Sequence, residues 1–327
     1  MTDLSRGISI GPDTSTSRLV AERVAQVLRP IGALKRLDEL AVWLAGWQRT
    51  ETPGIDSAHV VVFAGDHGVA VEGVSAYPQS VTMSMVGALH GGIATASALS
   101  RRVGATLSVI DVGRGVPTAN IRTGPALTPP QFESAVEVGR QAVLSLGRVD
   151  VLIPGEVGIG NTTCASALAA ALYGGDVTKW VGRGTGLDDD GLARKAEVVA
   201  EAVRRAGPAE PLELLRQLGG WELAAIAGAV IQARESSIPV LLDGFVTTAA
   251  VMPLEVVQPG FLEHCWPAHV SAEPGHRALV ERLGRAPILD LEMRLGEASG
   301  ALVALPILDL AAVAVTDVAT FADIGTS

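Results

Sequence analysis

Short apolar runs that end in an acid or a glycine alternate with helical patterns from about residue 57 onward. The runs are VVVFAGD up to Asp66, LSVID up to Asp111, VLIPGE up to Glu156 and PVLLDG through Asp243. Helical spacing of apolar residues lies between them, over 83–99, 135–146, 193–203 and 223–233. This alternation predicts an α/β fold in which helices cover both faces of a mainly parallel sheet, a Rossmann-like three-layer arrangement.

The two ends of the chain carry helical patterns without candidate chemistry. One apolar face comprises Leu19, Val20, Val24, Val27 and Leu28, and a second comprises Leu37, Leu40, Ala41, Val42 and Leu44. Trp43 and Trp47 are four residues apart, which favours packing together over ligand binding. The apolar run 298–316 contains Pro306 and Asp309 and predicts a buried helix, not a membrane span.

Acidic side chains stand where the four predicted strands end. Ligands of parallel sheets bind outside the carboxyl ends of the strands, so these acids are expected on one rim of the sheet. For any one of them, a turn or a helix cap is the simpler alternative. The four acids are Asp66, Asp111, Glu156 and Asp243.

Two glycine-rich loops follow one another, and each opens a predicted helix. The first contains Gly155, Gly158 and Gly160, offers Asn161, Thr162 and Thr163 as candidate N-caps, and enters an Ala-rich helix over 165–172. The second follows Trp180 and Val181, contains Gly182, Gly184 and Gly186, and enters a helix near Asp188. Glycine permits positive φ, and a helix start offers unpaired N–H donors, so the pair predicts a phosphate cradle with Arg183 and Lys195 beside it.

Simpler interpretations of these loops stay open. Neither has the spacing of a P-loop or of a dinucleotide fingerprint, and a single such loop is equally well a turn that needs glycine for its geometry. Lys195 is alternatively a solvated surface charge. The run Asp188 to Asp190 is interpreted as a helix start, not a magnesium site, because acids favour the positive end of the helix dipole.

Two further groups are isolated in the sequence. His67 has no second His or Cys at ligand spacing, which favours a structural hydrogen-bonding role over metal binding or general-base chemistry. Glu297 lies between Gly296 and the candidate helix cap Ser299, and from its context alone it is a structural carboxylate.

Composition narrows the class of partner. The 327 residues are 48% hydrophobic and carry a formal net charge of -10, which argues against nucleic-acid or anionic-membrane surfaces and favours small-molecule partners. The two cysteines, Cys164 and Cys265, form no CxxC pair, so neither a disulfide framework nor a zinc knuckle is predicted. The first residues lack an apolar segment behind positive charge, so no signal peptide and a cytoplasmic location are expected.

The chain resembles the nicotinate-nucleotide–dimethylbenzimidazole phosphoribosyltransferases from about residue 57 to its end. The motifs that carry the resemblance are DHGVAVEGVSAYPQSVT (66–82), GEVGIGNTT (155–163), VGRGTGLDDDGLARK (181–195), GGWELAAIAGAV (219–230), IPVLLDGFVTTAA (238–250), SAEPGH (271–276) and LDLEMRLGEASGALVALPIL (289–308). Seven long motifs in the family's order make a chance match implausible.

The resemblance implies a fold and a reaction. It implies a helical segment over 1–56, an α/β substrate-binding domain over 57–290, and a segment over 291–327 that carries the catalytic loop and completes a small helical lobe; it also implies a homodimer. The reaction is transfer of the 5-phosphoribosyl group from nicotinate mononucleotide to 5,6-dimethylbenzimidazole with inversion, in the assembly of the lower ligand of cobalamin. Because a pyridine leaves as a neutral nitrogen, neither a metal nor another cofactor is expected.

Residue roles follow from the resemblance, position by position. Glu297, in the LGE motif, corresponds to the base that takes the proton of the incoming azole, and Glu156 faces the same ribosyl centre. The residues expected to hold the 5'-phosphate and ribose are Gly158, Gly160, Asn161, Thr162, Gly182, Arg183, Gly184, Gly186 and Lys195. Ser75, Tyr77 and Gln79 are expected to border the benzimidazole pocket.

Departures from the family pattern leave acceptor selectivity open. Val270 stands where the family commonly has Arg, and Val157 lies beside the expected base pocket; Gly65, Cys164 and Ala298 are further departures. Alternative hypotheses are a non-catalytic nucleotide-binding or sensor protein on the same scaffold, and an enzyme that uses the same donor with another azole, a purine or a phenolic acceptor.

Overall fold

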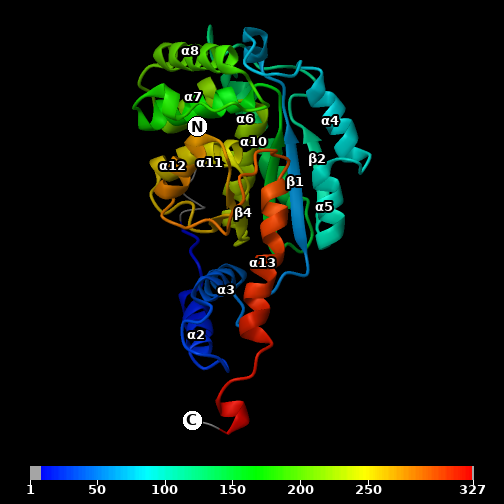
Figure 1. Cartoon of the computed structure of the whole chain (residues 1–327), viewed down its shortest axis with the longest axis vertical. Coiled ribbons are helices and arrows are strands. Elements are labelled where there is room, and N and C mark those ends of the chain that lie inside the picture. The colour runs from blue at the N-terminus through cyan, green and yellow to red at the C-terminus, as the bar shows by residue number, and fades with distance from the viewer. Residues whose placement is uncertain (1–8, 326–327) are drawn as a thin grey trace.

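A five-stranded parallel sheet forms the centre of the chain, with strand order β2-β1-β3-β4-β5 (Figure 1). The computed structural model describes residues 9–325. The strands are β1 (Ala58–Ala64), β2 (Thr106–Asp111), β3 (Val151–Val157), β4 (Val240–Leu242) and β5 (Cys265–Pro267). A second, two-stranded parallel sheet pairs β6 (His269–Val270) with β7 (Leu289–Asp290). The predicted parallel α/β fold is confirmed.

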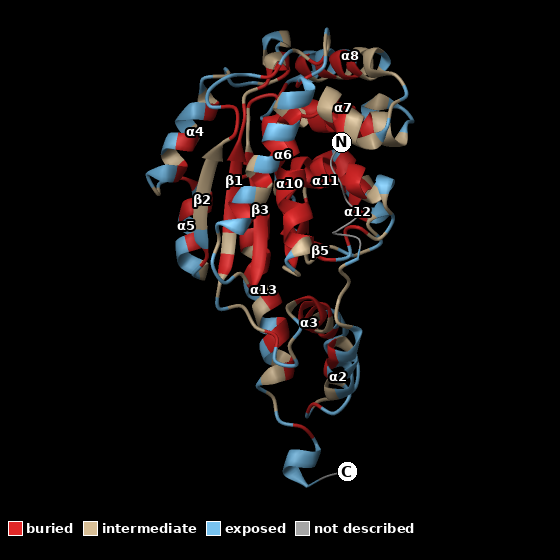
Figure 2. Cartoon of the chain, turned by 180° about the vertical axis from the view of Figure 1, so that it is seen from behind, coloured by how far each residue is buried: buried red, intermediate tan, exposed pale blue. Residues whose placement is uncertain are grey.

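Helices cover both faces of the large sheet because alternate strand residues point to opposite sides. On β1, Val61 and Phe63 enter one buried cluster, whereas Val60 and Val62 enter the other. The first cluster lies under α6 (Pro129–Leu144), α7 (Asn161–Tyr173), α8 (Asp189–Ala206), α9 (Pro211–Leu218), α10 (Trp221–Glu235), α11 (Phe245–Val257) and α12 (Pro274–Arg282). The second lies under α3 (Lys35–Gln48), α4 (Val81–His90), α5 (Thr95–Val103) and α13 (Ser299–Thr316). Figure 2 shows the central strands and α10, the helix of the first layer next to them, coloured as buried.

A small group of helices extends beyond the sheet. Helix α2 (Thr14–Val24) packs on α3, and both lie beside the far half of α13, which runs out of the main body (Figure 1). Val20, Ala41 and Val315 form their shared core. The domain boundaries expected at residues 56 and 290 stay predictions.

The sequence patterns misplaced some details. The helical pattern over 83–99 is two helices, because Gly91 and Gly92 end α4 and Gly92 has φ +71°. Leu19 and Leu28 are more than a third exposed, so the first apolar face is narrower than expected. Trp43 and Trp47 both donate to the carbonyl of Glu263, but their rings pack against Trp266 and His264 respectively.

Within the described residues, α13 is the single helix whose length and hydropathy would permit a membrane span. More than half of that stretch is buried inside the protein, as expected for a core helix. Three short 3-10 helices complete the fold: η1 (Gly68–Glu72), η2 (Val177–Lys179) and η3 (Ala322–Ile324). The no-signal-peptide prediction concerns residues 1–17, of which 1–8 lie outside the described part.

Candidate active site

A cavity of about 450 Å³ lies beyond the carboxyl ends of β1, β3 and β4. Glu156, near the end of β3, lines it directly. Asp243 follows β4 just behind the wall, where its carboxylate accepts the N–H of Ala301 and lies 3.5 Å from His269. Asp66 follows β1 and Asp111 is the last residue of β2, but neither is among the lining residues. Of the four acids predicted on this rim, Glu156 lines the cavity and Asp243 lies behind the cavity wall.

The first glycine loop turns into α7 at Gly160, which has φ +99° and is the N-cap. The predicted side-chain caps were therefore wrong by one residue or more, since Asn161 is already helical and donates from Nδ2 to the Glu156 carboxylate. Gly158, Gly160, Asn161 and Thr162 all line the cavity. The start of α7 thus points its free N–H groups at the cavity beside a tethered carboxylate.

A buried lysine joins the second glycine loop to the first. Lys195 Nζ donates to Thr162 Oγ1 at 2.8 Å and to the Gly182 carbonyl at 3.0 Å. Lys195 is fully buried, so the surface-charge interpretation is wrong. Burial lowers its pKa to about 8, although the nearby carboxylate of Glu273 opposes that shift.

The loop itself is held in place from the other side. Glu273 accepts the N–H of Gly184 at 3.0 Å, and a Cβ on Gly182 would overlap the same carboxylate. Arg183 points elsewhere, since its guanidinium binds the Leu187 carbonyl and Asp189. Of this loop, Gly184 and Thr185 line the cavity, whereas Gly182, Arg183, Gly186 and the Lys195 side chain do not. The predicted cap of the next helix is correct: Asp188 accepts the N–H of Gly191.

Glu297 reaches the cavity on a backbone segment of unusual conformation. Gly296, Glu297 and Ala298 have φ of +86°, +61° and +68°, a left-handed region that side-chain-bearing residues seldom occupy. The segment is fixed to β3 by a hydrogen bond from Glu297 N–H to the Glu156 carbonyl. Ala298 is the N-cap of α13, where the sequence suggested Ser299.

Glu156 and Glu297, which both line the cavity, have raised pKa values. Burial raises the pKa of Glu297, opposed by the N–H of Ala96 and reinforced by Asp243. Burial raises the pKa of Glu156 well above its usual range, reinforced by Asp243 and Glu222 and opposed by Asn161. Glu297 is 4% exposed and lines the cavity. It therefore meets the geometric and electrostatic needs of a general base near neutral pH.

The loop after β1 closes part of the cavity. Ser75 Oγ lies 3.0 Å from Thr185 Oγ1, which also accepts the N–H of Ala76, so this loop is tied to the second glycine loop. Ser75 and Tyr77 line the cavity and Gln79 does not. Apolar side chains complete this part of the wall: Val74, Val81, Met85 and Leu295.

Sequence reasoning missed several lining residues. These are Thr185, Phe245, His269, Ser271, Glu273 and Arg294. Ser271 and Glu273 belong to the SAEPGH motif, and Arg294 stands three residues before Glu297, so their place in motifs was the signal that could have identified them.

His67 lies behind the first loop and is fully buried. Its Nε2 is 2.6 Å from Glu222 and its Nδ1 is 3.2 Å from Cys164 Sγ. Although burial, the largest single effect, lowers the pKa of His67, Glu222 and Cys164 together outweigh it, and the pKa lies well above its usual value. A structural role, as predicted, agrees with these contacts. Among residues 9–325, three or more His, Cys, Asp or Glu side chains nowhere gather in a metal-holding arrangement.

A parallel α/β fold with two acids and two glycine loops around one cavity defines a candidate sugar-phosphate transferase. A family model described as "Phosphoribosyltransferase" matches residues 10–325. The chain belongs to the nicotinate-nucleotide–dimethylbenzimidazole phosphoribosyltransferase family.

Relatives with that name match nearly the whole chain. One from Roseobacter denitrificans is 48% identical over 306 residues, covering 93% of this chain and 90% of its own. One from Mesorhizobium japonicum is 48% identical over 319 residues, covering 97% and 94%. The crystal structure of CobT from Thermus thermophilus superposes with a TM-score of 0.91 at 40% identity, covering 96% of this chain and 99% of that one.

Proposed function

We propose that this chain transfers the 5-phosphoribosyl group of nicotinate mononucleotide to 5,6-dimethylbenzimidazole and releases nicotinate. The observation that carries the proposal is one cavity that brings Glu156 and Glu297 next to two linked glycine loops. Family membership supplies the donor and acceptor, since the relatives are named for both. The product is α-ribazole 5'-phosphate, a component of the lower ligand of cobalamin.

The step balances without an external acid. A ring nitrogen of the benzimidazole attacks C1 of the ribose from the face opposite the pyridinium. The C–N bond breaks, and its electron pair returns to the pyridine nitrogen, which leaves neutral. The proton on the second nitrogen of the benzimidazole passes to the Glu297 carboxylate, whose raised pKa favours accepting it.

Glu156 serves the opposite need, stabilising positive charge that develops on the sugar. A carboxylate beside an oxocarbenium-like centre lowers the energy of the transition state when it is already oriented. The amide of Asn161 holds the Glu156 carboxylate, and that contact opposes the effect of burial on its pKa. Asn161 therefore keeps the second carboxylate both aligned and more readily ionised.

The start of α7 is proposed to bind the 5'-phosphate. The Asn161 N–H donates to the Gly158 carbonyl, so the N–H groups proposed to bind the phosphate are those of Gly160 and Thr162, with Gly184 alongside. Lys195 acts from behind by fixing Thr162 and the second loop, and its positive charge favours an anion there. Gly182 and Gly186 shape that loop, whereas Arg183 supports it through Leu187 and Asp189.

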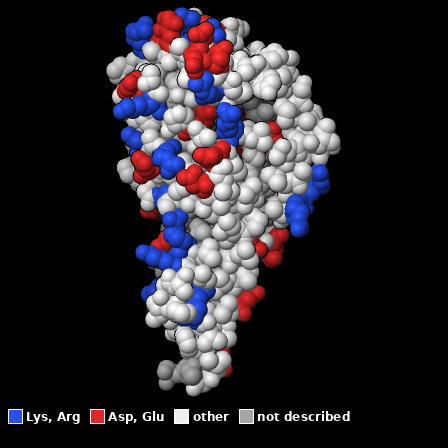
Figure 3. Space-filling view, in the orientation of Figure 1, with Lys and Arg blue, Asp and Glu red and all other residues white. Residues whose placement is uncertain are grey.

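Ser75 and Tyr77, with Met85 and Leu295, are proposed to form the walls around the benzimidazole. Apolar walls suit a flat, weakly polar ring. The chain is further proposed to work in the cytoplasm as a homodimer, with a small lobe drawn from 1–56 and 291–327. On the face seen in Figure 3, acidic and basic side chains are interspersed over the α8 end, where a nucleic-acid surface would need a continuous basic patch.

The proposal is tested by mixing the purified chain with nicotinate mononucleotide and dimethylbenzimidazole between about pH 6 and 9. We expect stoichiometric release of nicotinate and formation of α-ribazole 5'-phosphate, separated by chromatography. A sensor on the same scaffold would bind the nucleotide without turnover of any azole. Rates for adenine and phenolic acceptors in the same assay measure acceptor selectivity. Donor binding without release of nicotinate to any acceptor would refute the assignment.

A further inference from the structure

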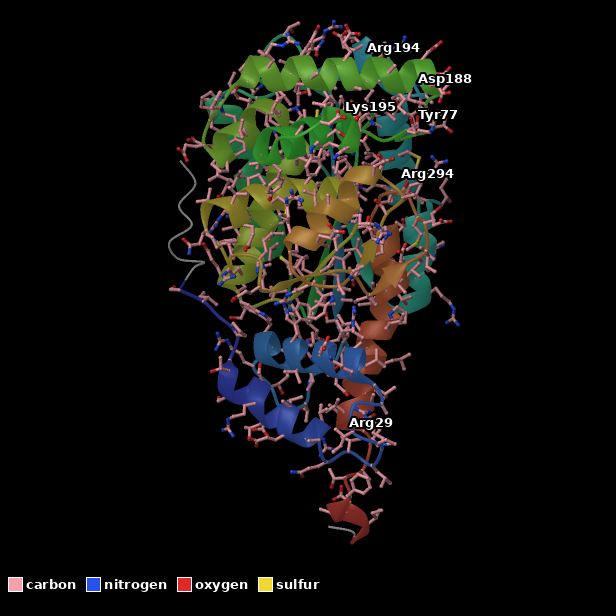
Figure 4. All side chains as sticks on the ribbon, turned by 60° about the vertical axis from the view of Figure 1, so that its left-hand side comes forward. Arg29, Tyr77, Asp188, Arg194, Lys195 and Arg294 are labelled. Carbon is pink, nitrogen blue, oxygen red and sulfur yellow. The ribbon has the colours of Figure 1, made fainter. Side chains whose placement is uncertain are left out.

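Arg294 stands out among the residues that line the cavity because its charge is not used by the protein. It is the one Lys or Arg among the described lining residues, and its side chain is exposed at the cavity mouth. Within residues 9–325 its guanidinium makes no hydrogen bond or ion pair. Figure 4 shows it on the same side of the molecule as Tyr77, which also lines the cavity.

Neighbouring cations are already engaged. Lys195 donates to Thr162 and to the Gly182 carbonyl, and Arg183 is bound to the Leu187 carbonyl and to Asp189. Lys195 and Arg183 belong to the glycine-loop side of the cavity, where the phosphate is proposed to bind. Arg294 belongs to the segment that precedes Glu297, on the side where the heterocycles react.

Negative charge dominates the rest of the lining. Glu156, Glu273 and Glu297 face the cavity, and Asp243 lies directly behind it. Such a site attracts a pyridinium ring but repels a carboxylate carried on that ring. Nicotinate mononucleotide carries such a carboxylate, so a cation is needed where the ring substituent lies.

We infer that Arg294 binds the ring carboxylate of the donor and thereby selects nicotinate mononucleotide over its carboxamide counterpart, nicotinamide mononucleotide. A guanidinium fork matches a carboxylate with two parallel N–H···O bonds, whereas a carboxamide offers one acceptor and no charge. The inference rests on the proposed function for its substrate. It also gives the departing nicotinate anion a partner at the cavity mouth as the C–N bond breaks.

The test measures kcat/KM for both donors, and their Kd in the absence of acceptor, for wild type, Arg294→Gln and Arg294→Lys. We expect Arg294→Gln to lower the preference for nicotinate mononucleotide by about ten- to a hundredfold, the effect of losing a charged hydrogen-bond pair. Arg294→Lys keeps the charge without the fork, so an intermediate loss is expected. The KM for dimethylbenzimidazole should not change.

Arg194→Gln is the matched control. Arg194 lies on α8, donates to the Gly73 carbonyl and is not a lining residue, so its loss removes the same charge without touching the ligand (Figure 4). Its donor preference should equal that of wild type. If Arg294→Gln weakens both donors equally, the arginine binds the phosphate and the inference is wrong; an unchanged preference also overturns it. Failure of wild type to release nicotinate would refute the proposed function instead, and the Kd ratio would still decide the role of Arg294.

Discussion

Replacing Glu297 by glutamine separates the chemistry of this carboxylate from its place in the fold. Glutamine has the same shape. Within residues 9–325 the Glu297 side chain accepts one hydrogen bond, from the Ala96 N–H to Oε2 at 3.5 Å, and the amide oxygen of glutamine can accept it equally well. The substitution therefore removes proton acceptance and little else. Loss of a general base reduces rates by about 10²- to 10⁴-fold, equivalent to about 3 to 5 kcal/mol in the barrier.

We expect kcat of Glu297→Gln to fall by at least about a hundredfold, while KM for nicotinate mononucleotide stays close to that of wild type. The donor's phosphate is proposed to bind at the start of α7, on a different wall from Glu297. Wild-type kcat should fall as pH drops through the raised pKa of Glu297, because protonation removes the base. That acidic limb should vanish in the variant. Initial rates of nicotinate release over the pH range measure both effects.

Stability should move in the opposite direction to activity. Because burial raises the pKa of Glu297 above its unfolded value, its contribution to folding is fully present below the unfolded pKa and is lost as pH rises through the folded pKa. At pH 8 the unfolded chain ionises this carboxyl freely, so burial costs the wild type folding free energy that Glu297→Gln does not lose. Urea unfolding should show the variant at least as stable as wild type at that pH.

Glu292→Gln is the control, since Glu292 is an exposed residue in the same segment and should keep full activity. A fall in kcat of less than about tenfold in Glu297→Gln would remove Glu297 from its proposed role. A marked loss of stability at pH 8 would instead make the carboxylate structural.

Two further substitutions test the geometry around this residue. Gly296→Ala should lower kcat at least about tenfold and destabilise the fold by about 1 to 3 kcal/mol, because its φ is +86° and its Cβ would lie 2.5 Å from Glu156 Oε1. The control is Gly147→Ala, where a Cβ meets nothing within 4 Å, and it should change neither urea unfolding nor rate. Equal behaviour of the two variants would refute the argument. Lys195→Met should raise KM for the donor without changing KM for the azole. Because burial lowers the pKa of Lys195 to about 8, wild type should gain stability relative to Lys195→Met as pH rises from 8 toward 10.5. If the difference in unfolding free energy between the two proteins, measured with urea, does not change over that range, the lowered pKa of Lys195 is wrong.

The sequence predicted the sheet well because buried parallel strands are continuous apolar runs, as in residues 60–64 and 151–153. It also predicted which loops meet, since parallel strands end on one side. Glu156 reaches the cavity for that reason. The break within 83–99 was missed because apolar residues have helical spacing both before and after Gly91 and Gly92, so the two helices looked like one.

The directions of the side chains could not be predicted from the sequence. Lys195 and Arg183 were both expected beside the phosphate, yet Lys195 points into the protein and Arg183 binds its own loop and the start of the next helix. That difference depends on Thr162 and Gly182, whose positions follow from tertiary packing. Arg294 was also missed, because the sequence does not show that its side chain lies at the cavity and an exposed arginine ordinarily has no specific role.

Helix α13 begins at Ser299, two residues after Glu297, and ends among the helices beyond the sheet. Its 18 residues form a rod of about 27 Å at the usual rise per residue. The same helix therefore ties the backbone next to the Glu297 carboxylate to the packing of α2 and α3 at its other end, so the position of this side chain depends on both ends of the chain.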